Sequence, residues 1–211
     1  MSLRDQSHTK IPSQSSLDSQ ALQSELERNR QVLDVLHNIT VACHGITSFK
    51  AIFEVICREL RNIFHFDSCY ISLFDNQQPD RFLASLMIDG DEMEYQENMG
   101  IGELTSLILR DRRPLLFYDL LEERKTLARQ PEPFGAAHKR SRSWLGVPLL
   151  IGQAAVGVIS IQSYEVGRYT EHDCEQLMRI GNVVAVAIEN AYLDQNQQTL
   201  SLALSEQVAA R

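Results

Sequence analysis

Four cysteines, Cys43, Cys57, Cys69 and Cys174, are the strongest potential nucleophiles in the chain. None lies in a CxxC pair, and none has a histidine or a second cysteine at the spacing of a metal site. Cys43 directly precedes His44, but adjacent residues on a helix point apart. The sequence therefore predicts neither a disulfide framework nor a metal centre. Free cysteines without a pairing pattern favour a reducing compartment such as the cytoplasm.

Polar side chains also occur where a buried strand is expected. Residues 155–164 are rich in β-branched types, and alternation places Ser160 and Gln162 on one face with Val158. A wholly buried face would not carry these polar groups. Either this face meets water or it lines a ligand cavity, and the residues alone leave both interpretations open.

No motif for hydrolysis or phosphate binding stands out. The chain shows no Ser-His-Asp order, phosphate-cradling glycine loop or cluster of metal-ligand types. Gly100 and Gly102 suit a turn into a following helix, and the acidic stretch 92–97 is expected to be a solvated loop. Thr170 and Asp173 have the spacing of an N-terminal helix cap, which explains them better than catalysis does.

Composition is that of an ordinary globular domain. The chain has 211 residues, 44% of them hydrophobic, and a formal net charge of −8. This acidity argues against a nucleic-acid partner, because phosphate binding needs a concentrated basic face. The basic group at 138–142, beside the only tryptophan, Trp144, is expected to be a solvated loop. There is no secretory signal and no apolar run long enough to span a bilayer, so a cytoplasmic protein is expected.

The order of predicted elements indicates an α+β fold with mostly antiparallel neighbours. Apolar residues recur at helical spacing near both chain ends, and strand-like runs bounded by turn signals lie between them. The predicted helices are 17–44, 49–63, 104–110 and a last one from 171; the predicted strands are 69–74, 81–88, 115–118, 144–151 and 155–164. Segment 119–141 has no clear period, and a loop of that length is usually functional or disordered.

Both terminal helices carry an apolar seam beyond what one domain could cover. In the first helix the seam follows coiled-coil steps of four and three: Leu22, Leu26, Asn29, Leu33, Leu36, Thr40 and Cys43. From Val32 onward the stripe widens, as expected where a helix packs on a domain. Past Leu193 only Leu200 and Leu204 continue a seam in the last helix. These patterns divide the chain into a disordered tail (1–16), an N-terminal helix (17–33), a central domain (34–193) and a C-terminal helix extension (194–211).

The strands and the last helix carry the residues of a known family. Four segments resemble the most recognisable part of the GAF family: 142–149 (RSWLGVPL), 156–163 (VGVISIQS), 169–173 (YTEHD) and, further along the last helix, 186–191 (VAIENA). Upstream, 100–103 (GIGE) through Pro114 and Asp119 looks like that family's passage of short helix and strand. The resemblance covers roughly 34–193. It implies a GAF-like central antiparallel sheet with N- and C-terminal helices packed on one face.

The resemblance also implies that a ligand would lie between the sheet and segment 119–141. Eight residues are then candidates for lining this cavity: Phe117, Asp119, Phe134, His138, Ser143, Trp144, Ser160 and Gln162. Relatives that bind cyclic nucleotides carry Asn-Lys after the strand that ends here at Gln162, where this chain has Ser163-Tyr164. Relatives that bind bilins attach them through a loop cysteine, which 119–141 lacks. Neither cofactor is expected, a single loop histidine gives little support for haem, and the ligand stays unknown.

One main hypothesis and two rivals follow. The main hypothesis is a regulatory sensor module, not an enzyme, that binds a small molecule and passes the change through flanking helices paired as a parallel homodimer. Its output would be a domain such as the histidine kinase or diguanylate cyclase of bacterial signalling proteins. The first rival is a GAF domain that binds no ligand and serves as a dimerisation spacer. The second is a redox enzyme using Cys69 or Cys174, although GAF relatives that reduce methionine sulfoxide use cysteines in loops.

Overall fold

The computed structural model describes residues 14–46, 48–74, 81–97, 100–126 and 140–209. Within these ranges, six strands form one antiparallel sheet in the order β3-β2-β1-β6-β5-β4. The strands are β1 (Ser68–Phe74), β2 (Phe82–Asp89), β3 (Glu92–Glu97), β4 (Leu115–Phe117), β5 (Ser143–Ile151) and β6 (Ala154–Ser163). The helices are α1 (Gln14–Cys43), α2 (Phe49–Leu60), α3 (Glu103–Asp111), α4 (Leu120–Glu123) and α5 (Glu171–Ala209), with a short 3-10 turn, η1 (Arg124–Thr126).

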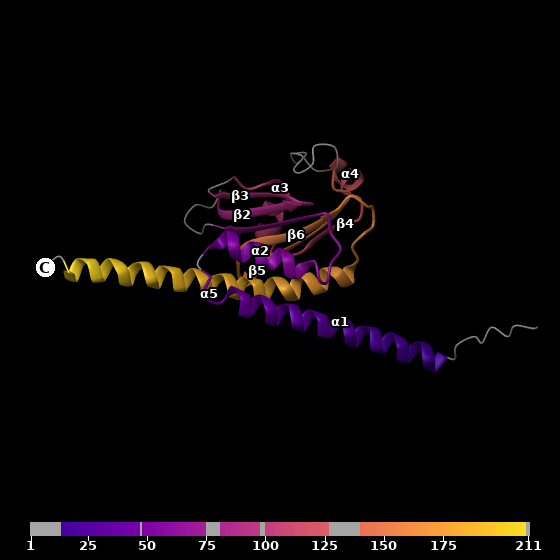
Figure 1. Ribbon diagram of the computed structural model, residues 1–211. Coiled ribbons are helices and arrows are strands. Elements are labelled where there is room, and N and C mark those ends of the chain that lie inside the picture. Colours follow the sequence, from indigo (N-terminus) through magenta and orange to yellow (C-terminus); the bar gives the residue numbers. More distant parts are fainter. Residues whose placement is uncertain (1–13, 47, 75–80, 98–99, 127–139, 210–211) are drawn as a thin grey trace, which may run out of the picture.

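Helices lie on both sides of the sheet (Figure 1). The long helices α1 and α5, together with α2, lie below it in that view, and α3 and α4 lie above it. We call the two sides of the sheet the lower face and the upper face. The predicted α+β class, with a GAF-like antiparallel sheet and both terminal helices on one face, is confirmed.

The main core lies between the lower face and the three lower helices. Strand alternation sends Leu145, Val147 and Leu149 of β5 to this face, and all three are fully buried. Ile159 in β6 and Ile180 in α5 belong to the same cluster. Burying one such side chain contributes about 1.5–3 kcal/mol, so this layer supplies most of the fold's apolar stabilisation.

A smaller core lies on the upper face. Leu104 and Ile108 of α3 pack there with Trp144, Val158 and, from α4, Leu120. The upper face is thus apolar only where α3 and α4 cover it. Its central strands carry the polar residues described below.

Three local expectations need correction. Residues 92–97 are not a solvated loop, because they pair with β2 as the edge strand β3; acidic side chains are tolerated on an edge strand that faces water. The first helix begins at Gln14, ahead of the expected Leu17. Part of segment 119–141 is regular, since α4 lies within it. The turn signals at 75–80 lie outside the described residues.

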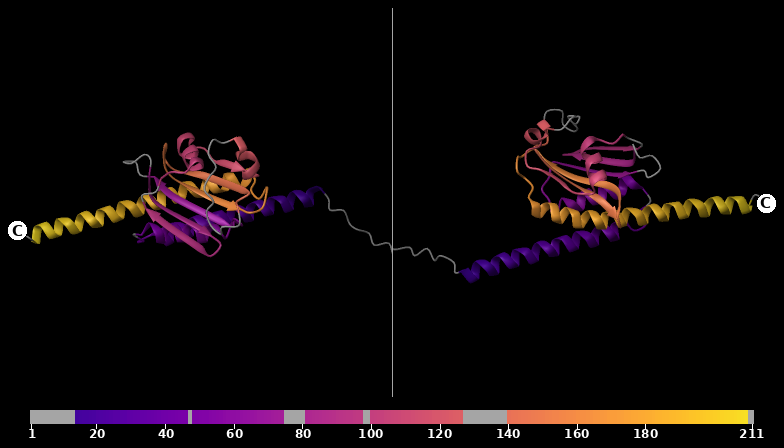
Figure 2. Two further views of the ribbon diagram at one scale, coloured as in Figure 1. Left: turned by 90° about the horizontal axis from the view of Figure 1, so that it is seen from above. Right: turned by 180° about the vertical axis from the view of Figure 1, so that it is seen from behind.

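The terminal helices run in the same chain direction and contact each other, yet extend past the sheet at opposite ends (Figures 1 and 2). On α1, Val32, Val35 and Ile39 are buried against the domain. The seam residues Leu26 and Leu33 are instead 61% and 65% exposed, so this part of the apolar seam is not covered by any of the described residues. The side chains of Leu200 and Leu204 are not among those described. None of the described helices combines the length and apolarity needed to cross a bilayer.

Candidate functional site

The upper face brings together four of the eight predicted site residues. Phe117 of β4 pairs with Trp144 of β5, and Trp144 pairs with Gln162 of β6. The Phe117 and Trp144 rings meet edge to face, with centroids 6.1 Å apart. The amide of Gln162 accepts a hydrogen bond from Ser141 Oγ at 2.8 Å. Ser160 lies two residues before Gln162 on the same face.

Of the other four candidates, two lie elsewhere and two are not among the described residues. Ser143 shares the lower-face position of Leu145 at the end of β5, so its side chain does not reach the upper face. Asp119 caps α4 and faces Arg142. Phe134 and His138 lie outside the described residues. The structure therefore gathers a smaller set than the eight residues suggested by family resemblance.

The centre of the upper face is a strip of hydroxyl groups. Ser160 is only 1% exposed, and its Oγ has no hydrogen-bond partner among the described residues. Across the ladder it faces Tyr70 of β1, which is followed on the same face by Ser72. Burial raises the pKa of Tyr70 to about 12. The Oγ of Ser72, like that of Ser160, is buried without a hydrogen-bond partner among the described residues. A buried hydroxyl without a partner costs about 1–3 kcal/mol, and a polar group beside Ser160 would recover part of that cost.

The indole of Trp144 covers the glycine opposite this strip. A Cβ at Gly146 would lie 2.2 Å from Cη2 of Trp144 and 2.9 Å from Cδ1 of Ile108. The ring therefore occupies the space above Gly146, and Gly146 is the direct partner of Ser160 in β6. No larger residue at 146 would leave room for this arrangement. The only tryptophan of the chain lies one strand away from the unpartnered hydroxyl.

Charged groups border the same face where α3 begins. Glu103 opens α3, and its Oε2 is buried without a hydrogen bond to any described residue. Arg124 of η1 is 8% exposed. Burial lowers the pKa of Arg124, and the nearby Glu103 carboxylate opposes that effect. The border of the hydroxyl strip thus carries charges of both signs.

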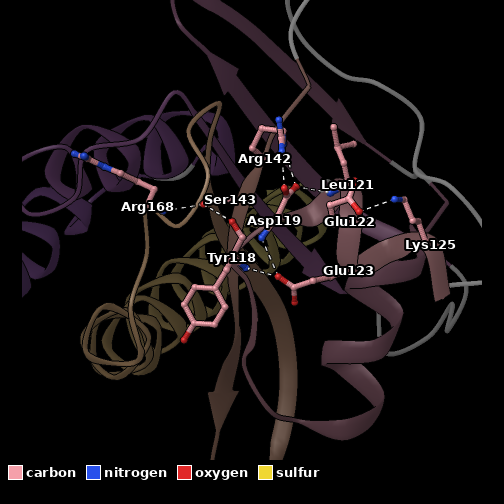
Figure 3. Close-up of polar contacts among 9 residues, drawn as sticks. All are labelled: Tyr118, Asp119, Leu121, Glu122, Glu123, Lys125, Arg142, Ser143 and Arg168. Atoms are coloured by element: carbon pink, nitrogen blue, oxygen red, sulfur yellow. Dashed lines mark hydrogen bonds and ion pairs between the residues drawn. The ribbon is translucent and has the colours of Figure 1, made fainter.

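A cluster of polar contacts joins the two ends of segment 119–142 (Figure 3). The Arg142 guanidinium binds the Asp119 carboxylate, with Nε 3.0 Å from Oδ1, and the Leu120 amide donates to the Arg142 carbonyl at 2.5 Å. The hydrogen bond from Arg142 lowers the pKa of Asp119. Glu123 accepts from the amides of Tyr118 and Asp119, both at 2.8 Å. The ends of the segment are therefore fixed to each other.

The same cluster continues to the start of α5. Ser143 Oγ donates to the Tyr118 carbonyl at 3.1 Å and accepts from the Arg168 amide at 2.9 Å. The Gly167 amide also donates to the Tyr118 carbonyl, at 2.7 Å. Three residues after Arg168, α5 begins at Glu171. Hydrogen bonds thus connect the residue after β4 to Gly167 and Arg168, in the connection that precedes α5.

A family model described as a GAF domain matches residues 46–189, well over half of the chain. The chain belongs to the GAF family. A search of curated proteins found no match.

Solved GAF structures share this fold. The GAF domain of an Acinetobacter phosphoenolpyruvate-protein phosphotransferase is 18% identical, with a TM-score of 0.56 over 76% of this chain and 94% of that one. The corresponding domain of Coxiella burnetii is 15% identical, with a TM-score of 0.59 over 78% and 96%. A free methionine-R-sulfoxide reductase of Neisseria meningitidis, solved with its substrate, is 16% identical, with a TM-score of 0.53 over 79% and 91%. At these identities the likeness shows the fold alone.

The cysteines of this GAF domain are buried. All four are free thiols, and the Sγ atoms of Cys57 and Cys69 lie 3.1 Å apart in the main core. Burial raises the pKa of Cys43 to about 11 and also raises the pKa of Cys174. A thiol is nucleophilic only as thiolate, so this environment disfavours thiol chemistry at neutral pH. Among the described residues, no three His, Cys, Asp or Glu side chains converge as metal ligands do.

Several residues of the upper face are absent from the sequence-based set. Tyr70 and Ser72 could have been found, because they alternate with buried apolar residues in the run 69–74, as Ser160 does in β6. Glu103 and Arg124 carry no such signal, since only the tertiary fold brings η1 beside the first turn of α3.

Proposed function

We propose that this GAF domain is a regulatory sensor that binds a small molecule against the upper face. The observation that carries the proposal is the unpartnered Oγ of Ser160, fully buried between Tyr70 and Gly146. A polar group retained at this cost suggests that a ligand supplies the missing hydrogen bond. Aromatic and hydroxyl side chains around a few convergent polar groups are typical of small-molecule sites.

The conformational change caused by ligand binding would pass to α5 through the hydrogen bonds at the base of segment 119–142. Tyr118 and Ser143 join that base to Gly167 and Arg168, just before α5. A ligand shifts the equilibrium between two conformational states only if it binds them with unequal affinity. In this proposal the two states differ in the position of the Tyr118–Ser143 pair, and hence in the position of the first turn of α5.

The terminal helices would carry the signal across a parallel homodimer. The exposed seam residues Leu22, Leu26 and Leu33 need a partner, and a second copy of α1 offers the same seam. The continuing helix α5 would connect to an output domain such as a kinase or cyclase. We infer a cytoplasmic location from the free cysteines.

Native mass spectrometry of the protein as purified tests the ligand proposal. The expected result is a dimer that carries an additional non-covalent mass, which Ser160→Val releases because valine fills the site without a polar group. Ser106→Val, on the exposed surface of α3, is the matched control and should keep the mass. If wild-type protein carries no mass, or Ser160→Val keeps it, the site does not bind the molecule.

The spacer hypothesis has one observation in its favour. The Trp144 ring already occupies the space above Gly146, as expected if the domain's own side chains fill the place of a ligand. In that case wild-type protein would be an unliganded dimer in the same experiment. Thiol catalysis has less support, because the cysteines are buried and their thiolates are disfavoured.

A further inference from the structure

A hollow of about 320 Å³ lies away from the upper face, where the connection after α2 meets the connection before α5. One wall is formed by Arg61 and residues 64–67, and the other by Ser163, Glu165 and Arg168. The Tyr169 hydroxyl, 3.5 Å from the His65 carbonyl, joins the two walls. In Figure 3 the Arg168 side chain points away from the Ser143 cluster, although its amide takes part in that cluster.

The hollow holds a cation without an ionic partner. Arg61 ends α2, and its guanidinium lies 4.6 Å from the centroid of the Phe66 ring. This stacking restricts the side chain while leaving its hydrogen-bond donors available. No carboxylate of the described residues forms an ion pair with Arg61. The other arginine of the hollow, Arg168, is already paired with Glu165 at 3.6 Å.

The same hollow holds an anion without an ionic partner. Oδ2 of Asp67 accepts hydrogen bonds from Ser163 Oγ and the Tyr164 amide, both at 2.8 Å, which fixes the carboxylate. Its Oδ1 accepts no hydrogen bond from the described residues. Asp67 is partly buried, and no lysine or arginine forms an ion pair with it in the described part of the chain. Opposite charges thus line one hollow without neutralising each other.

We propose that this hollow binds a small zwitterion, specifically a free α-amino acid. The α-carboxylate would pair with the Arg61 guanidinium, and the α-ammonium group would donate to Asp67 Oδ1. Phe64 also lines the hollow but is only 3% exposed, so the ligand side chain would gain little apolar contact there. A volume of about 320 Å³ is at the lower end of ligand sites, which suits a molecule of this size.

This proposal is independent of the ligand site on the upper face. The two sites use different residues and lie on different parts of the sheet. They meet at Arg168, whose side chain borders the hollow and whose amide binds Ser143, and at Asp67, whose amide donates to the Gln162 carbonyl at 2.9 Å. An amino acid in the hollow would therefore act next to the start of α5.

Three probes with the same side chain test the contribution of each charge of the ligand. L-leucine carries both charges, leucinamide lacks the carboxylate, and 4-methylpentanoate lacks the ammonium group. Titration of the full-length chain is followed by backbone amide chemical shifts in two-dimensional NMR spectra. Leucine is expected to bind weakly, on the order of 1 mM, because both protein charges stay in contact with solvent. It should bind at least about tenfold more tightly than either single-charge probe, since each lacks one ionic contact.

Shifts are expected at residues 61–68 and 163–168, with the Trp144 indole signal unchanged. Arg61→Gln should remove leucine binding, and Asp67→Asn should reduce the preference for leucine over 4-methylpentanoate. Arg58→Gln is the matched control on the same helix, because Arg58 is exposed and pairs with Glu59 instead. It should leave leucine binding unchanged.

Each other outcome overturns the proposal in a recognisable way. Equal binding of 4-methylpentanoate and leucine would make the hollow a simple anion site, and equal binding of leucinamide a simple cation site. Shifts centred on Trp144 would assign the amino acid to the upper face. Absence of shifts with all three probes, or unchanged binding in Arg61→Gln, would show that the hollow binds no amino acid.

Discussion

Ser160→Ala should stabilise this GAF domain, which is unusual for a substitution in a buried strand. The Ser160 hydroxyl is buried without a partner among the described residues, whereas Ser163, on the same strand β6, donates to Asp67 and accepts from the Glu165 amide. Removing an unsatisfied hydroxyl recovers its desolvation cost, while removing a satisfied one loses hydrogen bonds. Alanine substitutions at these two serines, three residues apart on one strand, should therefore change the free energy of unfolding in opposite directions.

The magnitudes follow from the contacts. An unsatisfied buried polar group costs about 1–3 kcal/mol, and alanine at 160 gives back part of that, about 1 kcal/mol after the loss of packing around the oxygen. Ser163→Ala leaves the Asp67 carboxylate with one donor fewer and should cost about 1–2 kcal/mol. For a chain of this length, 1 kcal/mol corresponds to a Tm change of about 2–4 °C.

Urea unfolding followed by Trp144 fluorescence measures both variants. The protein is first unfolded and refolded, so that any co-purified molecule is lost before the comparison. Destabilisation of Ser160→Ala by 1 kcal/mol or more would refute the reasoning, because it would mean that the hydroxyl has a partner in the free protein. Equal effects of the two substitutions would refute it as well.

Three further predictions concern other parts of the molecule. Gly146→Ala should displace the Trp144 ring, shift its emission to longer wavelength and cost about 1–3 kcal/mol in unfolding free energy; unchanged emission would contradict the packing seen here. Asp119→Asn should destabilise the domain at neutral pH, and because Arg142 lowers the Asp119 pKa in the folded state, the deficit relative to wild type should shrink as pH falls below about 4; a deficit that persists there would exclude the ion pair as its cause. If the protein is the proposed homodimer, Leu33→Glu should shift its sedimentation toward that of a monomer, without changing the fold measured by circular dichroism.

The fold was largely predictable because its signals are periodic. Alternation in β5 and β6, helical spacing in α2 and α5, and the capping box at Thr170 and Asp173 each specify a local structure. The edge strand β3 was missed because Glu92, Glu94 and Glu97 look like solvated loop residues. An edge strand pairs with only one neighbouring strand, and for β3 that strand is β2.

The candidate site was less predictable, because tertiary contacts decide it. Sequence alternation correctly groups Ser160 with Gln162, but it cannot show that Ser143 binds the Tyr118 carbonyl. Nor can it show that a Cβ at Gly157 would lie 2.2 Å from the Ser72 carbonyl oxygen of the neighbouring strand. The distance between strands at this point is a property of the whole sheet and leaves no local trace in the sequence.

The connection before α5 is where the two proposed sites meet. Ser143 and Tyr118 contact it at the base of segment 119–142, through hydrogen bonds to the amides of Gly167 and Arg168. The hollow contacts it from the other side, through the Arg168 side chain. Either ligand would therefore bias the same short segment, whose position sets the direction of a helix that extends well past the domain. If both ligands favour one position of this segment, each must strengthen the binding of the other by the same factor, because coupling between two sites is reciprocal.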